Sequence, residues 1–92
     1  MGARTELLVS ADLMYRGYDV FRALSPSCNC DLVIFKNGEI VRVEVRTGYK
    51  NLRGDISYNK PPPDRSDVIA VWVHGQNKIV YINARSKETI DL

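Results

Sequence analysis

A chain of 92 residues is long enough for one domain, and most of its apolar residues must serve a single core. The hydrophobic fraction of 45% and the charged fraction of 26% are those of globular domains and exclude a disordered chain. A net charge of +2 permits nucleic-acid binding without indicating it, and the absence of a signal-peptide pattern or a bilayer-length apolar run predicts a cytoplasmic protein with no membrane partner.

The first third of the sequence predicts a helix followed by a short strand. Residues 4–16 carry apolar side chains at helical spacing, and Gly17 is a natural stop. The expected apolar stripe contains Leu7, Ala11 and Met14, widened by Leu8 and Val9. Residues 18–24 then alternate between apolar and polar types, which is typical of an edge strand, before a turn-rich segment begins at Ser25.

Residues 31–35 and 40–46 form a predicted β-hairpin around Asn37 and Gly38. Asn-Gly favours a two-residue type I′ turn because both positions take positive φ. That turn fixes the register and places Asp31 opposite Glu44. Side-chain alternation assigns one set of residues to the core and leaves the charged residues on the other face. The predicted core-facing residues are Leu32, Ile34, Val41, Val43 and Val45.

The remaining sequence predicts a loop and a second hairpin. Residues 49–67 are polar, with a short strand at 56–58 and three consecutive prolines that exclude a central strand. Residues 68–73 are almost wholly apolar, as in a strand covered on both faces, and residues 78–82 are its expected antiparallel partner. The tail after residue 83 is predicted to make a final helical turn.

The predicted pairing of Asp31 with Glu44 indicates chemistry. Facing residues on antiparallel strands have Cβ atoms about 4.5–5.5 Å apart, where two like charges destabilise a sheet. Mg²⁺ or Mn²⁺ would offset this repulsion, because these ions bind a few carboxylates together with water and phosphate. Such an ion serves phosphodiester cleavage, with Arg46 holding an attacking water or a phosphate oxygen. The alternative is a surface ladder of salt bridges that includes Arg42 and is worth under ~1 kcal/mol per pair.

Two segments carry a family resemblance. They are the helix and turn "TELLVSADLMYRGYDVFRALSPS" and the hairpin "CDLVIFKNGEIVRVEVRTG". Their order resembles the PD-(D/E)XK nuclease superfamily, closest to archaeal-type Holliday junction resolvases and small group I intron homing endonucleases. The resemblance implies an α/β (α+β) fold with a restriction-endonuclease-like core. In that core an N-terminal helix packs on a central mixed β-sheet with a catalytic β-hairpin, and residues 1–92 form one nuclease-like domain.

The resemblance also assigns residue roles. It implies that Asp31, Glu44 and the carbonyl of Val45 bind Mg²⁺ or Mn²⁺, and that Glu6 joins this site. Ser25 or Ser27 lies where resolvase-like members place a serine that contacts phosphate. The implied catalytic residues are Asp31, Glu44, Arg46 and Glu6.

The sequence departs from the family pattern at Cys30, which replaces a proline, and at Arg46, which replaces a lysine. Arginine stays protonated, so Arg46 cannot act as a general base, although it can stabilise negative charge. Three alternatives remain open: the metal alone activates water, Lys50 or Lys60 takes the place of the lysine, or the protein no longer cleaves.

The expected partner is DNA. Basic residues of the second hairpin strand and of the loop after it are predicted to contact phosphates, namely Arg42, Lys50, Arg53 and Lys60. The leading hypothesis is a Mg²⁺-dependent DNA endonuclease, restriction-like or junction-resolving, acting as a homodimer or homotetramer because two strands need two sites. The alternatives are a catalytically inactive DNA-binding member of the same fold and a purely structural domain.

Overall fold

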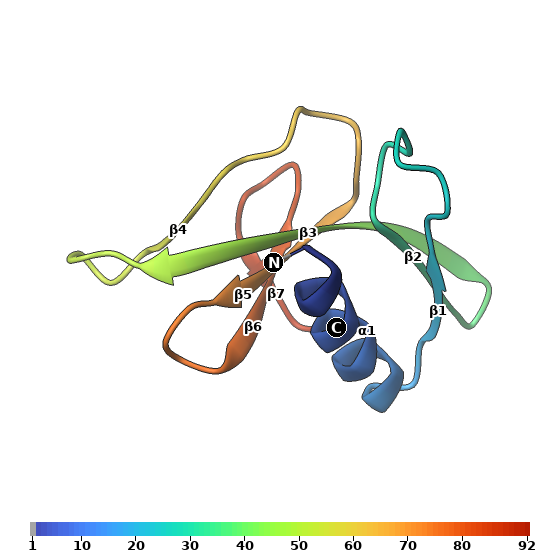
Figure 1. Cartoon of the computed structure of the whole chain (residues 1–92), viewed down its shortest axis with the longest axis horizontal. Coiled ribbons are helices and arrows are strands. Elements are labelled where there is room, and N and C mark those ends of the chain that lie inside the picture. Colours follow the sequence, from blue (N-terminus) through green and yellow to red (C-terminus); the bar gives the residue numbers. More distant parts are fainter. Residues whose placement is uncertain (1) are drawn as a thin grey trace.

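One helix and a seven-stranded mixed sheet make up the computed structural model, which describes residues 2–92 (Figure 1). The elements are α1 (Gly2–Tyr15), β1 (Asp19–Arg22), β2 (Leu32–Lys36), β3 (Glu39–Lys50), β4 (Ile56–Tyr58), β5 (Val68–Val73), β6 (Lys78–Asn83) and β7 (Thr89–Ile90). The strand order is β1-β2-β3-β5-β6-β7, and β4 pairs only with β3. The expected α+β fold, with an N-terminal helix on a mixed sheet, is confirmed.

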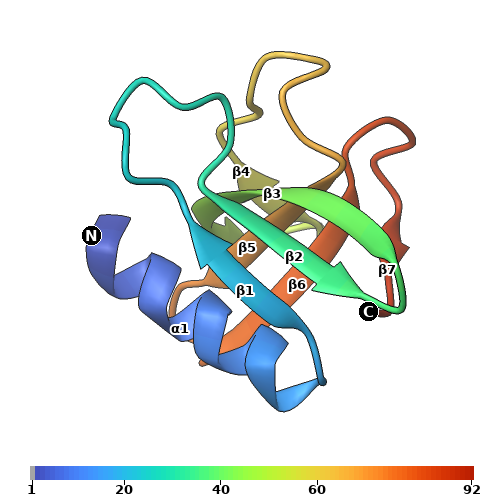
Figure 2. The same cartoon turned by 90° about the vertical axis from the view of Figure 1, so that its right-hand side faces the viewer.

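Helix α1 lies across one face of the sheet (Figure 2), but it buries a different stripe from the predicted one. Val9 and Leu13 are fully buried against side chains of β2 and β3, whereas Leu7 and Met14 are more than half exposed. The predicted stripe is therefore confirmed at Val9 and wrong at Leu7 and Met14. Apolar residues surround this helix, so periodicity alone does not select a face. Asp12 fixes the orientation, since its carboxylate accepts hydrogen bonds from buried Tyr81 and from Arg16.

The hairpin of β2 and β3 has the predicted register and core face. Its paired positions run from Lys36–Glu39 to Leu32–Val43, and the turn residues Asn37 and Gly38 have φ values of 52° and 84°. The turn therefore has the positive φ at both positions that a type I′ turn requires. Side chains of this face pack in the core with α1; they are Leu32, Ile34, Val41, Val43 and Val45.

Asp31 lies just outside this ladder, which corrects the expectation that it forms a cross-strand pair with Glu44. The last pair is Leu32–Val43. The Asp31 amide donates to the carbonyl of Val43, and the Asp31 carbonyl accepts from Ala23. Strand β1 ends at the same level, with the pair Arg22–Leu32. The Asp31 side chain is thereby free to turn toward the backbone of β3.

The parallel pairing of β3 with β5 makes the sheet mixed. The crossover between them contains β4 and the three prolines, and it covers the sheet face opposite α1. On that face Ile69, Val71 and Ile82 form a second buried cluster. Strand β5 is therefore covered on both faces, as predicted. No helix within residues 2–92 is long and apolar enough to cross a membrane.

The tail forms β7 instead of the predicted helical turn. The Asn83 side chain accepts hydrogen bonds from the amides of Arg85 and Ser86 and so stabilises a turn. Lys87 then takes a φ of 65°, which reverses the chain. Thr89 and Ile90 add to the edge of β6. Asparagine competes here with helix formation because its side chain bonds nearby amides.

Gly48 has no space for a side chain. A Cβ at this position would lie 2.5 Å from the carbonyl oxygen of Ser57 and 2.7 Å from Val71 Cγ1. We therefore expect Gly48→Ala to lower the free energy of unfolding by about 1–3 kcal/mol, as overpacking does elsewhere. Urea denaturation measures this change. Gly2→Ala is the control, because a Cβ there meets nothing within 4 Å; equal stability of the two variants would contradict the prediction.

Candidate active site

Several residues singled out in the sequence meet where the middle of β3 passes the first turns of α1. A cavity of about 300 Å³ opens between these elements. It is lined by Gly2, Thr5, Glu6, Asp31, Val45, Arg46 and Thr47. The structure thus brings Glu6, Asp31, Val45 and Arg46 together, although they come from three separate segments.

Asp31 is held against the backbone of β3. Its Oδ2 atom accepts a hydrogen bond of 2.8 Å from the amide of Val45. Because the carboxylate turns across the end of the ladder, it lies beside the main chain that joins Glu44 to Arg46. Asp31 therefore contributes to the predicted cluster through a different geometry from the cross-strand pair expected from register.

Glu44 is a buried acid with an incompletely satisfied carboxylate. Its side chain is only 4% exposed, and its Oε1 atom lies 3.6 Å from Arg46 Nη1. Within residues 2–92, its buried Oε2 atom has no hydrogen-bond partner. Burial, followed by the negative charge of Asp31, raises the pKa of Glu44, while the positive charges of Arg46 and Arg65 act in the opposite direction.

Arg46 covers two oxygens of the cluster with its guanidinium. Nη1 donates to the carbonyl of Val45 at 3.0 Å and also faces the Glu44 carboxylate. Nε donates to the carbonyl of Asn59, in the crossover after β4. The Val45 carbonyl and the Glu44 carboxylate are the oxygens that the family resemblance assigns to a metal. In this structure their positive partner is the arginine of the same strand.

Glu6 and the serines lie along the same region. Glu6 lines the cavity, and its carboxylate lies 3.6 Å from Arg22 Nη2 on β1. A second cavity of about 190 Å³ shares Glu6 and Asp31 and is also lined by Ser25. The hydroxyls of Ser25 and Ser27 lie 3.1 Å apart in an exposed turn. Ser25 therefore lies next to the acidic cluster.

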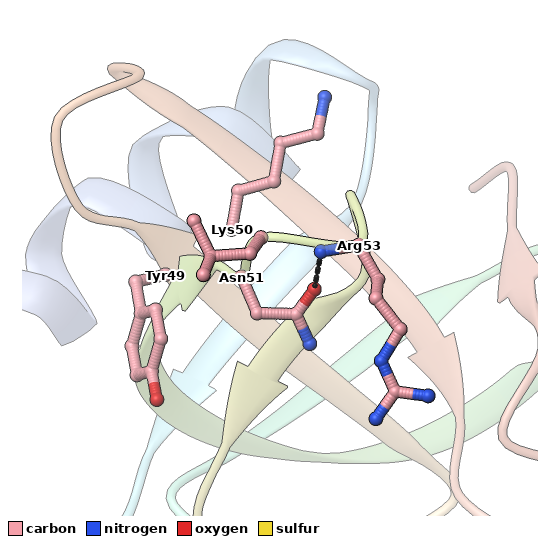
Figure 3. Close-up of a pocket in the computed structure, with 5 residues that line it drawn as sticks. Tyr49, Lys50, Asn51 and Arg53 are labelled. Atoms are coloured by element: carbon pink, nitrogen blue, oxygen red, sulfur yellow. Dashed lines mark hydrogen bonds between the residues drawn. The ribbon is translucent and has the colours of Figure 1, made fainter.

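The predicted DNA-contacting basic residues are spread over three places. Arg42 is engaged by Asp67, with hydrogen bonds of 3.2 and 3.0 Å, and its pKa is raised mainly by these bonds. Lys50 and Arg53 lie at the far end of β3 (Figure 3). Lys60 is exposed and follows Asn59, whose carbonyl accepts from Arg46.

Two residues lie near the site although the sequence did not place them there. Asn59 contacts Arg46 through a main-chain carbonyl, which any residue possesses. Arg65 donates to the carbonyl of Asn29 at 3.0 Å and places positive charge near Glu44. Both belong to an irregular crossover whose path depends on tertiary packing. The apolar periodicity and the turn residues of the sequence do not predict that this segment packs over β3.

The oxygen atoms of this cluster suit a hard divalent cation. Within residues 2–92, no group of three or more His, Cys, Asp and Glu side chains forms a metal-binding cluster. The site instead offers the carboxylates of Asp31 and Glu44 together with the Val45 carbonyl. Mg²⁺ typically takes one or two carboxylates and completes its shell with water and substrate phosphate. The buried, unpartnered Oε2 of Glu44 fits this use.

Comparison with known proteins supports the fold. Comparisons with protein-family models and with curated proteins found no match. Among solved structures, the chain is similar to the bacterial homing endonuclease I-Ssp6803I, with a TM-score of 0.74 and 13% sequence identity. The match covers 99% of this chain and 76% of that chain. At this identity the similarity shows the fold alone: a small α+β domain with one helix on a mixed central sheet.

Proposed function

We propose that this chain is a metal-dependent DNA endonuclease of the PD-(D/E)XK type, which hydrolyses phosphodiester bonds. The observation that carries the proposal is the buried Glu44 carboxylate, whose Oε2 has no partner within residues 2–92. It lies beside Asp31 and the Val45 carbonyl, in a fold similar to that of a homing endonuclease. A buried, unsatisfied carboxylate is costly and is retained where it serves a function.

Asp31, Glu44 and the carbonyl of Val45 would hold Mg²⁺ or Mn²⁺ in this site, with Glu6 at the rim of the cavity. When bound, such a cation supplies Lewis-acid stabilisation of the charge that builds on phosphate during hydrolysis. The protein fixes these oxygens before substrate arrives. The Val45 amide orients Asp31, and the packing of β3 between β2 and β5 holds Glu44. Preorganised charge of this kind is a main source of catalytic power.

Arg46 has two tasks in this proposal. Without a cation, its guanidinium neutralises Glu44 and caps the Val45 carbonyl. With substrate present, it turns toward a phosphate oxygen and stabilises negative charge there, which a permanently protonated group can do. It takes no proton from water. Lys60 is the better placed of the two replacement lysines, because it adjoins Asn59 and so lies near Arg46, whereas Lys50 lies farther along β3.

DNA is the proposed substrate, approached from the cavity side. Ser25 lies beside the acidic cluster, and the exposed Lys50, Arg53 and Lys60 supply positive charge for phosphate contacts. One chain offers one such cluster. Cleavage of both strands therefore calls for a homodimer or homotetramer with closed symmetry. A junction and a specific duplex site are both compatible with this arrangement.

A second candidate function is DNA binding without cleavage. It is favoured by the position of Arg46, whose Nη1 contacts the Val45 carbonyl and faces Glu44 Oε1. If that guanidinium stays in place, a built-in positive charge substitutes for the cation. The acids then stabilise the fold, and the basic residues alone contact DNA.

A cleavage assay separates the two functions. We expect the wild-type protein to nick supercoiled plasmid or cut four-way junctions in Mg²⁺ or Mn²⁺, and EDTA to stop the reaction. Arg46→Lys should retain cleavage, because lysine keeps the charge and releases two of the oxygens that arginine covers. Binding of the same DNA is measured in parallel by gel shift. Cleavage by Arg46→Lys alone, with DNA retention by both proteins, would favour the binding function; neither cleavage nor binding by either protein would rule out both.

A further inference from the structure

A two-stranded ribbon extends from one end of the sheet, at the left of Figure 1. Strand β3 pairs with β5 only as far as Gly48, but it continues to Lys50 and there pairs with β4 alone. Residues 48–58 therefore form a ribbon arm that lies outside the main sheet. The molecule measures 39 × 27 × 25 Å along its principal axes.

The tip of the ribbon arm is a defined structure. The side chain of Asn51 accepts hydrogen bonds of 3.0 Å from the amides of Arg53 and Asp55. The Asn51 amide donates to the Asp55 carbonyl at 2.8 Å, and Gly54 takes the φ of +88° that the turn needs. These bonds close the turn and hold its main chain (Figure 3).

The side chains at this tip point into solvent. Tyr49 is 56% exposed, Leu52 is fully exposed, and Lys50 and Arg53 are exposed as well. Within residues 2–92, neither Lys50 nor Arg53 forms an ion pair at this tip. Together with Asn51, these residues border a cavity of about 470 Å³ (Figure 3). Two unpaired cations beside apolar side chains suit a partner that carries phosphates and base edges.

We infer that the ribbon arm enters the major groove of duplex DNA and reads bases about six base pairs from the cleaved phosphate. This inference rests on the proposed nuclease function and identifies the part of the protein that selects the sequence. The B-DNA major groove accommodates a two-stranded β-ribbon, and arginine or lysine donates to guanine O6 and N7 there. Arg53 and Lys50 are the reading residues.

The distance between the cut and the bases that are read follows from β3, because this strand contains Glu44 and Val45 and then continues into the ribbon arm. Val45 lies on β3, which ends at Lys50, and Asn51 begins the turn six residues after Val45. At ~3.3 Å per residue the separation is about 20 Å, which matches about six base pairs at ~3.4 Å each. Gly48 pairs with Tyr58 of β4 and with Val73 of β5, so the base of the arm is anchored in the sheet. The offset between cut and read bases should therefore be constant.

A second copy of this chain is the other occupant to consider, because Leu52 is apolar and fully exposed. The charge at the tip argues against it. Lys50 and Arg53 flank Leu52, and the one acid of the turn is Asp55, so two copies that meet there would bring like charges together. DNA satisfies the same cations without such repulsion.

The test sequences the ends that the protein produces from a randomised duplex library in Mg²⁺. The wild-type protein should give a base preference at the cut and a second one about six base pairs away. Arg53→Ala should weaken the base preference at the distant position roughly tenfold or more, as loss of a bidentate base contact does. It should leave the base preference at the cut unchanged. Lys78→Ala removes an exposed lysine of β6 as the matched control and should change neither.

Each contrary outcome has a distinct meaning. Cleavage without the distant preference, or a distant preference that survives both Arg53→Ala and Lys50→Ala, overturns the role of the arm and leaves the nuclease proposal standing. Failure of the wild-type protein to cut any DNA overturns the proposed function and this inference together. A change in sedimentation coefficient for Leu52→Ser, with base preferences intact, assigns the arm to self-association and overturns the inference.

Discussion

Replacing Asp31 with asparagine should slow DNA cleavage by on the order of a hundred- to a thousand-fold while the fold persists. Loss of one preorganised charged group in an active site has effects of this size. The asparagine oxygen can still accept the hydrogen bond that the Val45 amide gives to Asp31, so the end of the hairpin keeps its anchor. The measurement is the single-turnover rate on supercoiled plasmid at saturating Mg²⁺.

Asp19→Asn is the matched control for this substitution. Asp19 is an exposed acid on β1 and has the same side chain, so its replacement changes the net charge equally. It should leave the cleavage rate within about twofold. If Asp31→Asn cleaves as fast as the wild-type protein does, Asp31 does not belong to the catalytic cluster. A loss of the circular-dichroism spectrum in Asp31→Asn would instead assign it a structural role.

Replacing Glu44 with glutamine should stabilise the protein in metal-free buffer and abolish its response to Mg²⁺. The Glu44 side chain is 4% exposed, and within residues 2–92 its Oε2 has no partner. Removing that buried charge should raise the free energy of unfolding by about 1 kcal/mol, or roughly 4–8 °C in Tm for a domain of this size. The wild-type protein should gain about 2.7 kcal/mol at a hundredfold excess of Mg²⁺ over Kd, and the variant should gain none.

The increase in the free energy of unfolding that Glu44→Gln produces should become larger as pH rises. Because the pKa of Glu44 is raised in the folded protein, the native state holds this proton more tightly than the unfolded chain does. Native stability is therefore lost as pH rises from the unfolded pKa, about 4.3, through the folded value. The variant and the wild-type protein should have equal Tm below pH 4 and should separate as pH increases.

Thermal unfolding with and without Mg²⁺, from pH 3 to pH 8, measures both effects. Glu88→Gln is the control, since Glu88 is an exposed acid in the turn before β7. Its Tm should follow that of the wild-type protein at every pH. A lower Tm for Glu44→Gln at pH 7 would mean that the pair with Arg46 stabilises the fold by more than burial costs it, and would contradict the prediction.

Local chemistry made the hairpin predictable, whereas tertiary packing decided the rest. Asn37 and Gly38 define the turn, and the turn defines every pair from Lys36–Glu39 to Leu32–Val43. The buried face of α1 was not predictable, because apolar side chains surround that helix and only contacts with the sheet choose Val9 and Leu13. The tail was misread because a side-chain cap at Asn83 outweighs weak helix propensity.

Four residues singled out from the sequence lie together in the structure, but their arrangement was not predicted, and Glu44 does not line the cavity that they share. The sequence pattern and the resemblance named Glu6, Asp31, Val45 and Arg46, which line one cavity. Neither indicated that Asp31 leaves the ladder to accept from the Val45 amide. Neither placed the crossover over β3, where the Asn59 carbonyl orients Arg46. Those features depend on main-chain amides and carbonyls, which nearly all residue types share, so the sequence does not reveal them.

The parallel pairing of β3 with β5 also sets when the acidic cluster can assemble during synthesis. A parallel pair needs a long crossover, and contacts across such a loop form late because chain closure costs entropy before packing compensates it. On the ribosome, the β2–β3 hairpin can form early, but Glu44 becomes buried only after residues 68–73 have emerged and docked. A nascent chain that stops before β5 therefore contains Asp31 and Glu44, but Glu44 is still exposed to solvent. Such a chain should be inactive until β5 has been synthesised and has paired with β3.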